Sequence, residues 1–285
     1  MGFESCKDVW YNEDITVRMA KQGRFAGKKG RFNLTNILLC GANGKMGHVV
    51  ESVVSQREDL TVTAGIDCNT TPYADFPICA ALNDFQGKAD VVVDFSHPAL
   101  LRDLLDYCVR TGTPLVAATT GYTPEQVQAI RDASEKVAIF FTFNLSIGIN
   151  LLIDLAQRAA AVLGDSFDVE IVEKHHRRKL DAPSGTALML ADAVNQSLGD
   201  RCQYEYDRHS RRQSRPANEI GIHSVRGGTI VGEHEVIFAG RDEVLTLSHS
   251  AASKEVFAVG AVNAAAFLAG KPAGLYRMKD LLQSS

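Results

Sequence analysis

Short apolar runs alternate with amphipathic stretches over the first half of the chain. The runs are rich in valine, isoleucine and leucine, as strands are, and the stretches between them have helical spacing of apolar residues. Thr123 and Pro124 suit the cap and the first turn of one such helix. This alternation predicts an α/β domain with a doubly wound parallel sheet of the Rossmann type. The strands are expected at 36–41, 60–66, 89–95, 114–119 and 137–142, and the helices at 45–56, at 100–109 and after 123.

The pattern changes after Asn144. Helices and strands no longer alternate regularly, which predicts a C-terminal α+β domain with an open mixed sheet. A last helix at 253–268 could pack back on the first domain, so we expect domains at 35–146 plus 254–285 and at 147–253. The other expected elements are helices at 148–163 and 184–198, a strand at 167–173, an irregular charged stretch at 201–215 and strands within 220–248.

Residues 1–34 differ from the rest of the chain. Six basic residues and no acidic one lie between Arg18 and Arg31, with glycines among them. A targeting peptide would explain the basic residues, but four acidic residues before Arg18 count against it. We favour a disordered basic extension, or a start codon placed upstream of the true one.

The composition limits the classes of partner. The chain is 45% hydrophobic and carries a formal net charge of -4, so no overall field attracts it to nucleic acid or to an anionic membrane. An anionic ligand must therefore be held by a local cluster of charges. No apolar stretch is expected to span a membrane, and the six cysteines are scattered without a metal-binding spacing. These features predict a cytoplasmic protein.

A glycine-rich segment, Gly41 to Gly47, lies between the first expected strand and the first expected helix. Glycines there allow a tight turn and let backbone N–H groups approach a pyrophosphate at the helix N-terminus. The spacing G-x-x-G-x-x-G is a weak signal alone, but Asp67 ends the second strand where a ribose-binding carboxylate is expected. The alternative is an ordinary glycine turn with Asp67 as a strand-end cap. We favour dinucleotide binding.

The choice between NADH and NADPH stays open. Asp67 favours a free ribose hydroxyl, as in NADH, and the adjacent Cys68 offers no cation for a 2′-phosphate. Lys45 could supply that cation.

The segment from Glu173 to Ala187 concentrates histidines and cations at the exit of a strand and ends in Pro-Ser-Gly-Thr at a helix start. Ser184 is a good N-cap, and Gly185 beside it leaves the first N–H groups open to an anion. The alternative is a solvated basic loop. A zinc site is not expected, because no cysteine or carboxylate lies at ligand spacing. We favour an anion site.

The sequence from residue 35 onward resembles the 4-hydroxy-tetrahydrodipicolinate reductase family, traditionally called dihydrodipicolinate reductases. The most specific shared motif is EKHHRRKLDAPSGTA at 173–187. The others are GANGKMG at 41–47, VVDFSHP at 92–98, ATTGY at 118–122, FNLSIGIN at 143–150, VGEHEV at 231–236 and HSAASKEVFAVGA at 249–261.

The resemblance implies a reductase that uses NADH or NADPH, or both, and binds the cofactor on the first domain. The glycine loop would hold the pyrophosphate and Asp67 the ribose, while two later loops would face the nicotinamide. The cofactor-binding residues would be Gly41, Ala42, Asn43, Gly44, Lys45, Met46, Asp67, Ala118, Thr119, Thr120, Thr142, Phe143, Asn144 and Leu145.

The resemblance also implies the chemistry of the second domain. Hydride would add to carbon 4 of a small dicarboxylate ring after loss of water, with His175 as the acid/base residue and Lys179 as the proton donor. The product would enter the diaminopimelate route to lysine, and the second domain would build a homotetramer through its sheet. The residues that would contact substrate are His176, Lys179, Ser184, Gly185, Thr186 and Lys254.

Three positions depart from the family pattern. Glycine is usual where Ala118 stands, and arginine is common where Lys254 stands. Cys68 occupies a position where NADPH-using members carry arginine, which favours NADH or dual use. Two alternatives remain: another NAD(P)-dependent amino-acid or hydroxy-acid oxidoreductase, and a non-catalytic NAD(P)-sensing regulator. Neither would need His175, Lys179 and the Ser-Gly-Thr helix start together.

Overall fold

The computed structural model describes residues 34–284, so the extension predicted at 1–34 lies outside the described residues, apart from Leu34. A seven-stranded sheet forms the first part of the fold, in the order β12-β6-β5-β4-β1-β2-β3 with every pairing parallel. Its strands are Thr35–Cys40 (β1), Leu60–Ile66 (β2), Ile78–Cys79 (β3), Val91–Asp94 (β4), Leu115–Ala117 (β5), Ala138–Phe141 (β6) and Gly274–Tyr276 (β12).

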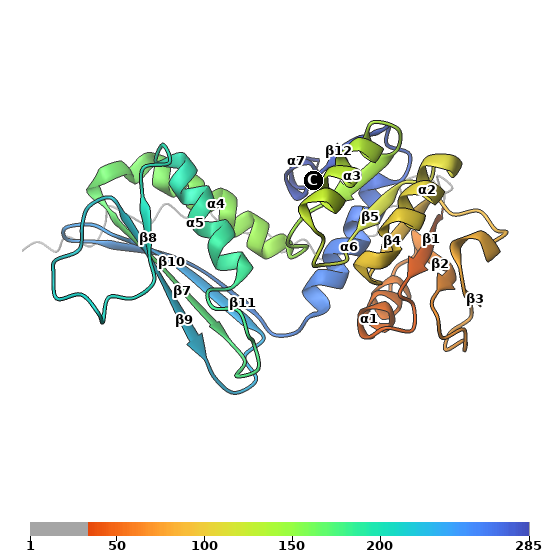
Figure 1. The fold of residues 1–285 in the computed structure, drawn as a ribbon, viewed down its shortest axis with the longest axis horizontal. Helices are drawn as coiled ribbons and strands as arrows, with labels where there is room; N and C mark the ends of the chain where they lie inside the picture. The colour runs from red at the N-terminus through yellow and green to blue at the C-terminus, as the bar shows by residue number, and fades with distance from the viewer. Residues whose placement is uncertain (1–33, 285) are drawn as a thin grey trace, which may run out of the picture. The chain divides into compact units, whose positions relative to one another are not determined.

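Helices cover both faces of this sheet (Figure 1). One apolar core joins α1 and α6 to strand residues such as Leu39 and Val93, and the other joins α2 and α3 to residues such as Leu38 and Val92. The prediction of a doubly wound sheet is confirmed. The elements are Lys45–Val54 (α1), Leu82–Asp84 (η1), Pro98–Leu100 (η2), Leu101–Thr111 (α2), Pro124–Ser134 (α3), Glu255–Leu268 (α6) and Met278–Gln283 (α7).

The second part is built on a five-stranded mixed sheet, in the order β11-β10-β7-β9-β8. The β7–β9 and β8–β9 pairings are parallel, whereas β10 runs antiparallel to both of its neighbours. Helices α4 and α5 pack on one face through residues such as Leu152 and Leu190. The elements are Ile147–Leu163 (α4), Gly164–Ser166 (η3), Asp168–His175 (β7), Gly185–Ser197 (α5), Gln203–Glu205 (β8), Glu219–Arg226 (β9), Gly232–Ala239 (β10) and Val244–Ala251 (β11).

Helix α6 returns to the first sheet, as its apolar sequence suggested. It contacts α1 and strands β4, β5 and β6. Gly260 is required at this contact, because a Cβ there would lie 1.8 Å from the carbonyl oxygen of Leu145. The chain therefore uses a helix from after the second sheet to complete one face of the first.

Besides the 3₁₀ turns η1, η2 and η3, four short elements of the described residues were not predicted: β3, β8, β12 and α7. Strands β3 and β12 have two and three residues, too few to show a periodicity. Strand β8 lies inside the stretch 201–215 that was expected to be irregular. The three strands extend the two sheets at their edges, and α7 follows β12, so none of these elements changes the fold class.

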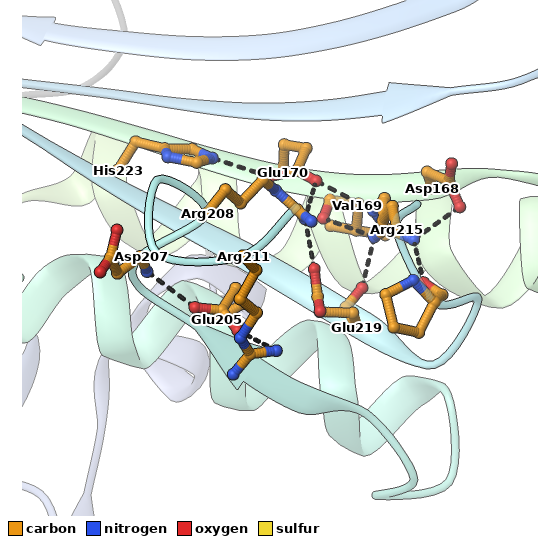
Figure 2. A network of polar contacts seen from close by, with 11 residues as sticks. Asp168, Val169, Glu170, Glu205, Asp207, Arg208, Arg211, Arg215, Glu219 and His223 are labelled. Atoms are coloured by element: carbon orange, nitrogen blue, oxygen red, sulfur yellow. Dashed lines mark hydrogen bonds and ion pairs between the residues drawn. The ribbon is translucent and has the colours of Figure 1, made fainter. Parts of the chain in front are cut away.

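Arginine side chains anchor the loop between β8 and β9 to the sheet (Figure 2). Glu170 on β7 pairs with Arg208 (2.8 Å) and Arg215 (2.9 Å), and also with His223 at 2.8 Å. The Glu170 carboxylate lies across β9 at Gly221, where a Cβ would be 1.7 Å from Oε2. The charged stretch is thus held to the sheet by ion pairs of Arg208 and Arg215 with Glu170, which span 38 and 45 residues of sequence.

The length of one apolar helical segment was underestimated from the sequence. Residues Ile147–Ser166 form a helical stretch whose length and mean hydropathy of 1.4 would suffice for a membrane span, contrary to the sequence-based expectation. In the fold, Ile149, Leu152, Ala156 and Ala160 of α4 are buried against the second sheet. This packing explains the apolar composition of one side of the helix.

Candidate functional site

The glycine turn lies at the point where the first sheet reverses its strand order. Strand β1 has β2 on one side and β4 on the other, and ligands of such sheets bind beyond the carboxyl ends of the strands at this point. Gly41 adopts φ +76°, and a Cβ on it would lie 2.6 Å from the carbonyl oxygen of Phe95. At Gly41 the turn therefore passes too close to its neighbour for a side chain.

A cavity of about 500 Å³ opens beside this turn. A dinucleotide fits the donor chemistry here, because the turn leads into the N-terminus of α1. The cavity lining is Gly41, Gly44, Ile66, Asp67, Cys68, Ala80, Phe95, Ser96, His97, Ala99 and Leu100. Of the other predicted loop residues, Ala42 is buried and Lys45 is exposed.

Asp67 touches the glycine turn directly. Its Oδ2 accepts a hydrogen bond from the backbone N–H of Asn43 at 3.0 Å, and its Oδ1 accepts one from Asn69 at 3.0 Å. The Asn43 side chain also donates to the carbonyls of Asn69 and Thr71. The carboxylate is thus both a turn cap and part of the cavity wall, so the two interpretations of Asp67 do not exclude each other.

Cys68 is exposed next to Asp67 on the wall of this cavity. We expect Cys68→Arg to raise the ratio of kcat/KM for NADPH over NADH, because a guanidinium there would pair with a 2′-phosphate. Steady-state kinetics with both cofactors measures the ratio, and Cys68→Ser is the matched control. An unchanged ratio in Cys68→Arg would refute the expected contact.

A buried carboxylate organises the loops where the nicotinamide end is expected. Asp94, at the end of β4, is fully buried and accepts hydrogen bonds from Ser96 Oγ (2.5 Å), Thr119 Oγ1 (2.7 Å) and Tyr122 OH (3.2 Å). Burial raises the pKa of Asp94 above the usual carboxyl value. This residue joins the loops after β4 and β5, which carry Ala118, Thr119 and Thr120.

The loop after β6 contacts the start of α5. Asn144 Nδ2 donates to Thr186 Oγ1 at 2.9 Å, while Asn144 Oδ1 accepts from the backbone of Ser146. Thr142 Oγ1 bonds the backbone of Asn144, and Leu145 is buried in the first core. Phe143 is 73% exposed. A predicted cofactor residue, Asn144, is therefore bonded to a predicted substrate residue, Thr186.

The seven residues predicted to act on substrate meet in one cavity of about 470 Å³. In the described part of the chain, the backbone N–H groups of Gly185 and Thr186 have no hydrogen-bond partner, and they open the α5 helix. Such an N-terminus attracts carboxylates. The cavity is lined by Phe143, His175, His176, Lys179, Ser184, Gly185, Thr186, Met189, Val231, Lys254 and Phe257.

His175 ends β7 and is held by a carboxylate that the sequence analysis did not single out. Its Nδ1 lies 2.5 Å from Oε2 of Glu173, which is fully buried and forms two bonds with Arg226 of β9. Burial is the main cause that lowers the pKa of His175, and it outweighs the attraction of Glu173. The imidazole is therefore neutral around pH 7.

Lys179 does not stand free in the cavity. Its Nζ lies 2.9 Å from Oδ2 of Asp181, two residues along the same loop. An incoming carboxylate must compete with Asp181 for this cation. Lys254 precedes α6 and lines the cavity, and the His176 Nδ1 is buried without a partner among the described residues.

A second histidine, His234, lies behind His175. The two imidazole rings pack edge to face, with their centroids 5.2 Å apart. The Nε2 atom of His234 lies 3.1 Å from Oγ of Ser184, the N-cap of α5. Burial lowers the pKa of His234 to about 4. As the pH falls below about 6.5, His234 is therefore protonated in the unfolded chain but stays neutral in the folded protein until about pH 4.

This difference predicts acid sensitivity. The stability that comes from a neutral His234 is complete above about pH 6.5 and is lost as the pH falls toward 4, by about 3 kcal/mol. We expect His234→Gln, which does not titrate and can still accept from Ser184, to lose correspondingly less stability. Urea unfolding of both proteins at about pH 7 and about pH 4 gives the comparison. Equal losses would show that His234 does not cause the effect.

The parallel sheet with a glycine turn at its switch point, together with a cavity lined by histidines and lysines, is typical of a nicotinamide-dependent oxidoreductase. Residues 35–145 match the N-terminal part of the dihydrodipicolinate reductase family, and residues 148–282 match its C-terminal part. The chain belongs to this family. It is an enzyme that uses NADH or NADPH.

Similar proteins match most of the length of this chain and support its membership of the family. The 4-hydroxy-tetrahydrodipicolinate reductase of Caldanaerobacter subterraneus subsp. tengcongensis is 50% identical over 250 residues, covering 88% of this chain and 99% of that protein. The Clostridium tetani reductase of the same name is 44% identical over 251 residues, covering 88% and 98%. A dihydrodipicolinate reductase from Paenisporosarcina sp. TG-14, solved with dipicolinate bound, has a TM-score of 0.73 at 26% identity, covering 86% and 97%.

Proposed function

We propose that the protein reduces 4-hydroxy-tetrahydrodipicolinate to tetrahydrodipicolinate, with loss of water, in the diaminopimelate route to lysine. The observation that carries the proposal is the cavity at the N-terminus of α5, where cations and free backbone donors converge on the space for a small dianion. Relatives that share 42–50% of their residues with this chain have this activity by name.

We propose a division of work among the cavity residues. Thr186, Gly185 and His176 bind the ring carboxylates, with Lys254 at the rim and Ser184 holding the helix start. Backbone N–H groups at a helix N-terminus bind a carboxylate without moving, so the ring is oriented before reaction.

Lys179 and His175 then transfer the proton that the reduced ring requires. Reduced nicotinamide, when bound along Gly41–Met46 and Asp67 and beside the loops at 118–120 and 142–145, supplies the hydride. Lys179, once released from Asp181 by the substrate carboxylate, donates a proton to the ring carbon next to the one reduced. His175 then accepts a proton from solvent at the basic Nε2 of its neutral ring, and the imidazolium that forms returns a proton to the neutral Lys179.

The experiment is a coupled assay with freshly made 4-hydroxy-tetrahydrodipicolinate, in which oxidation of NADH and of NADPH is followed separately. Substrate-dependent oxidation is expected, and pyridine-2,6-dicarboxylate should inhibit it competitively. Oxidation with amino or hydroxy acids only, or with no substrate, would contradict the proposal. A co-crystal with the inhibitor and NADH tests the site, which must show the inhibitor at Lys179 and Thr186.

We also propose that the protein is cytoplasmic and forms a homotetramer through the second sheet, with the cofactor domain at 35–146 plus 254–285 and the substrate domain at 147–253. Helices α4 and α5 cover one sheet face, while Val225 and Val244 remain 44% and 63% exposed. Exposed β-branched residues on a sheet favour association. Sedimentation velocity tests the assembly, and a monomer at micromolar concentration would contradict it.

A further inference from the structure

We infer that Glu173 and Arg226 form a positioning pair that fixes the tautomer of His175 and, through the same carboxylate, anchors the start of α5. The inference rests on the proposed function for its kinetic consequences, but the geometry and the tautomer stand apart from the identity of the substrate.

The Glu173 carboxylate is fully buried and uses both oxygens. Oε2 faces His175 Nδ1 at 2.5 Å and accepts from Arg226 Nη1 at 2.8 Å. Oε1 accepts from Arg226 Nη2 at 2.7 Å and from the backbone N–H of Ser184 at 3.1 Å. A buried carboxylate that lacked these partners would be strongly unfavourable, so the loss of one bond is expected to disturb the others.

These contacts determine which nitrogen of His175 carries the proton. The Arg226 hydrogen bonds keep the pKa of Glu173 at about 2, so the carboxylate is ionised and can only accept. Nδ1 of His175 must therefore be the protonated nitrogen, and Nε2 carries the lone pair. A Cβ on Gly232 would lie 3.1 Å from Nε2, so the glycine leaves room beside the nitrogen that exchanges protons.

The same carboxylate links the proton site to the anion site. By accepting from Ser184 it sets the first residue before α5, and Ser184 Oγ in turn accepts from the backbone of Ala187. Arg226 Nη2 also donates to the carbonyl of Asp181, the partner of Lys179. One ion pair thus fixes both ends of the loop that carries the cationic residues.

Arg226 also limits how strongly Glu173 attracts a proton to His175. The charged and titratable groups around the ring are Glu173 on β7, Arg226 on β9, His234 on β10 and Lys179 on the loop. With Arg226 balancing the carboxylate, the ring stays neutral in the free protein. Binding of a dianion nearby would favour its protonation.

The test is Glu173→Gln, which keeps the size of the side chain. Its amide would donate to Nδ1 of His175 and so reverse the tautomer, and we expect kcat to fall by ~100-fold or more while the Kd for pyridine-2,6-dicarboxylate changes by less than about threefold. Nitrogen-15 NMR of imidazoles, with His175 assigned by its loss in His175→Asn, should show protonated Nδ1 in the wild type and protonated Nε2 in the variant.

The matched control is Glu235→Gln, on β10. The Glu235 carboxylate pairs with Lys174 at 2.7 Å, and neither residue lines the cavity. It should leave kcat and the His175 tautomer unchanged. Arg226→Lys serves as a second variant, since it keeps the charge but loses the bidentate bond to Glu173. It should move the pH profile of kcat, because Glu173 then bonds His175 with less competition from the guanidinium.

A fall in kcat with an unchanged tautomer would overturn the inference, and so would a wild-type ring protonated at Nε2. If the wild type itself fails to oxidise NADH with the substrate, the proposed function fails. The NMR comparison of wild type and Glu173→Gln then still decides the positioning role.

Discussion

Replacing Lys179 or His175 with alanine is expected to lower kcat by ~100-fold or more, the usual contribution of a general acid or base. Both side chains line the cavity at the α5 N-terminus, and neither is needed for the core. Lys179→Ala removes the proposed proton donor. His175→Ala removes the group that we propose returns the proton to Lys179, and leaves Glu173 with Arg226 and Ser184 as remaining partners.

The two variants should differ in substrate binding. Lys179 contacts a carboxylate already in the free protein, that of Asp181, so its loss should raise KM as well. Arg178→Ala, an exposed change in the same loop, is the control and should retain full activity. Stopped-flow oxidation of NADH with purified substrate gives the rates. Near-normal turnover in both variants would mean that the proton is handled by other groups.

The second large effect is expected at Gly47. A Cβ at this position would lie 2.3 Å from the carbonyl oxygens of both Gly41 and Ala42, so Gly47→Ala must displace the glycine turn from the first turn of α1. Such overpacking costs about 1–3 kcal/mol, which corresponds to ~5- to 150-fold weaker binding of NADH if the cost falls on the bound state.

The Gly47→Ala substitution should weaken binding of the cofactor only. Isothermal titration should show normal binding of pyridine-2,6-dicarboxylate to Gly47→Ala, because we propose that this ligand binds at the N-terminus of α5. Ser52→Ala, on the exposed side of the same helix, is the control. An unchanged NADH Kd in Gly47→Ala would mean that the turn does not hold the pyrophosphate.

The sequence predicted the main strands well because their apolar runs are bounded by glycine, proline or charged residues. Leu60–Ile66 was predicted with its observed bounds, and the helix after Thr123 has the expected cap and proline. Strand β12 was missed because three residues carry too little pattern. Its place beside β6 depends on tertiary packing.

The site was predicted in part for a similar physical reason. Local chemistry indicated the helix start at Ser184 and the cations before it. The partners of those residues come from other strands: His175 lies opposite Arg226 in the parallel register of β7 and β9, more than 50 residues apart. Glu173 belonged to the motif, but only the strand register shows that it joins His175, Arg226 and Ser184. Asp94 could not be singled out for the same reason, because its partners Thr119 and Tyr122 lie on the loop after β5, 25 and 28 residues away.

The return of α6 has a consequence for the order in which the protein can be assembled during translation. Without this helix, apolar positions such as Leu39, Val93 and Val116 would face water on one side of the first sheet. The nucleotide-binding half is encoded first, yet it stays unfinished until the ribosome has passed through the whole substrate-binding half. A nascent chain paused near residue 146 would therefore expose an apolar, aggregation-prone sheet face, and would depend on chaperones until residues 255–268 emerge.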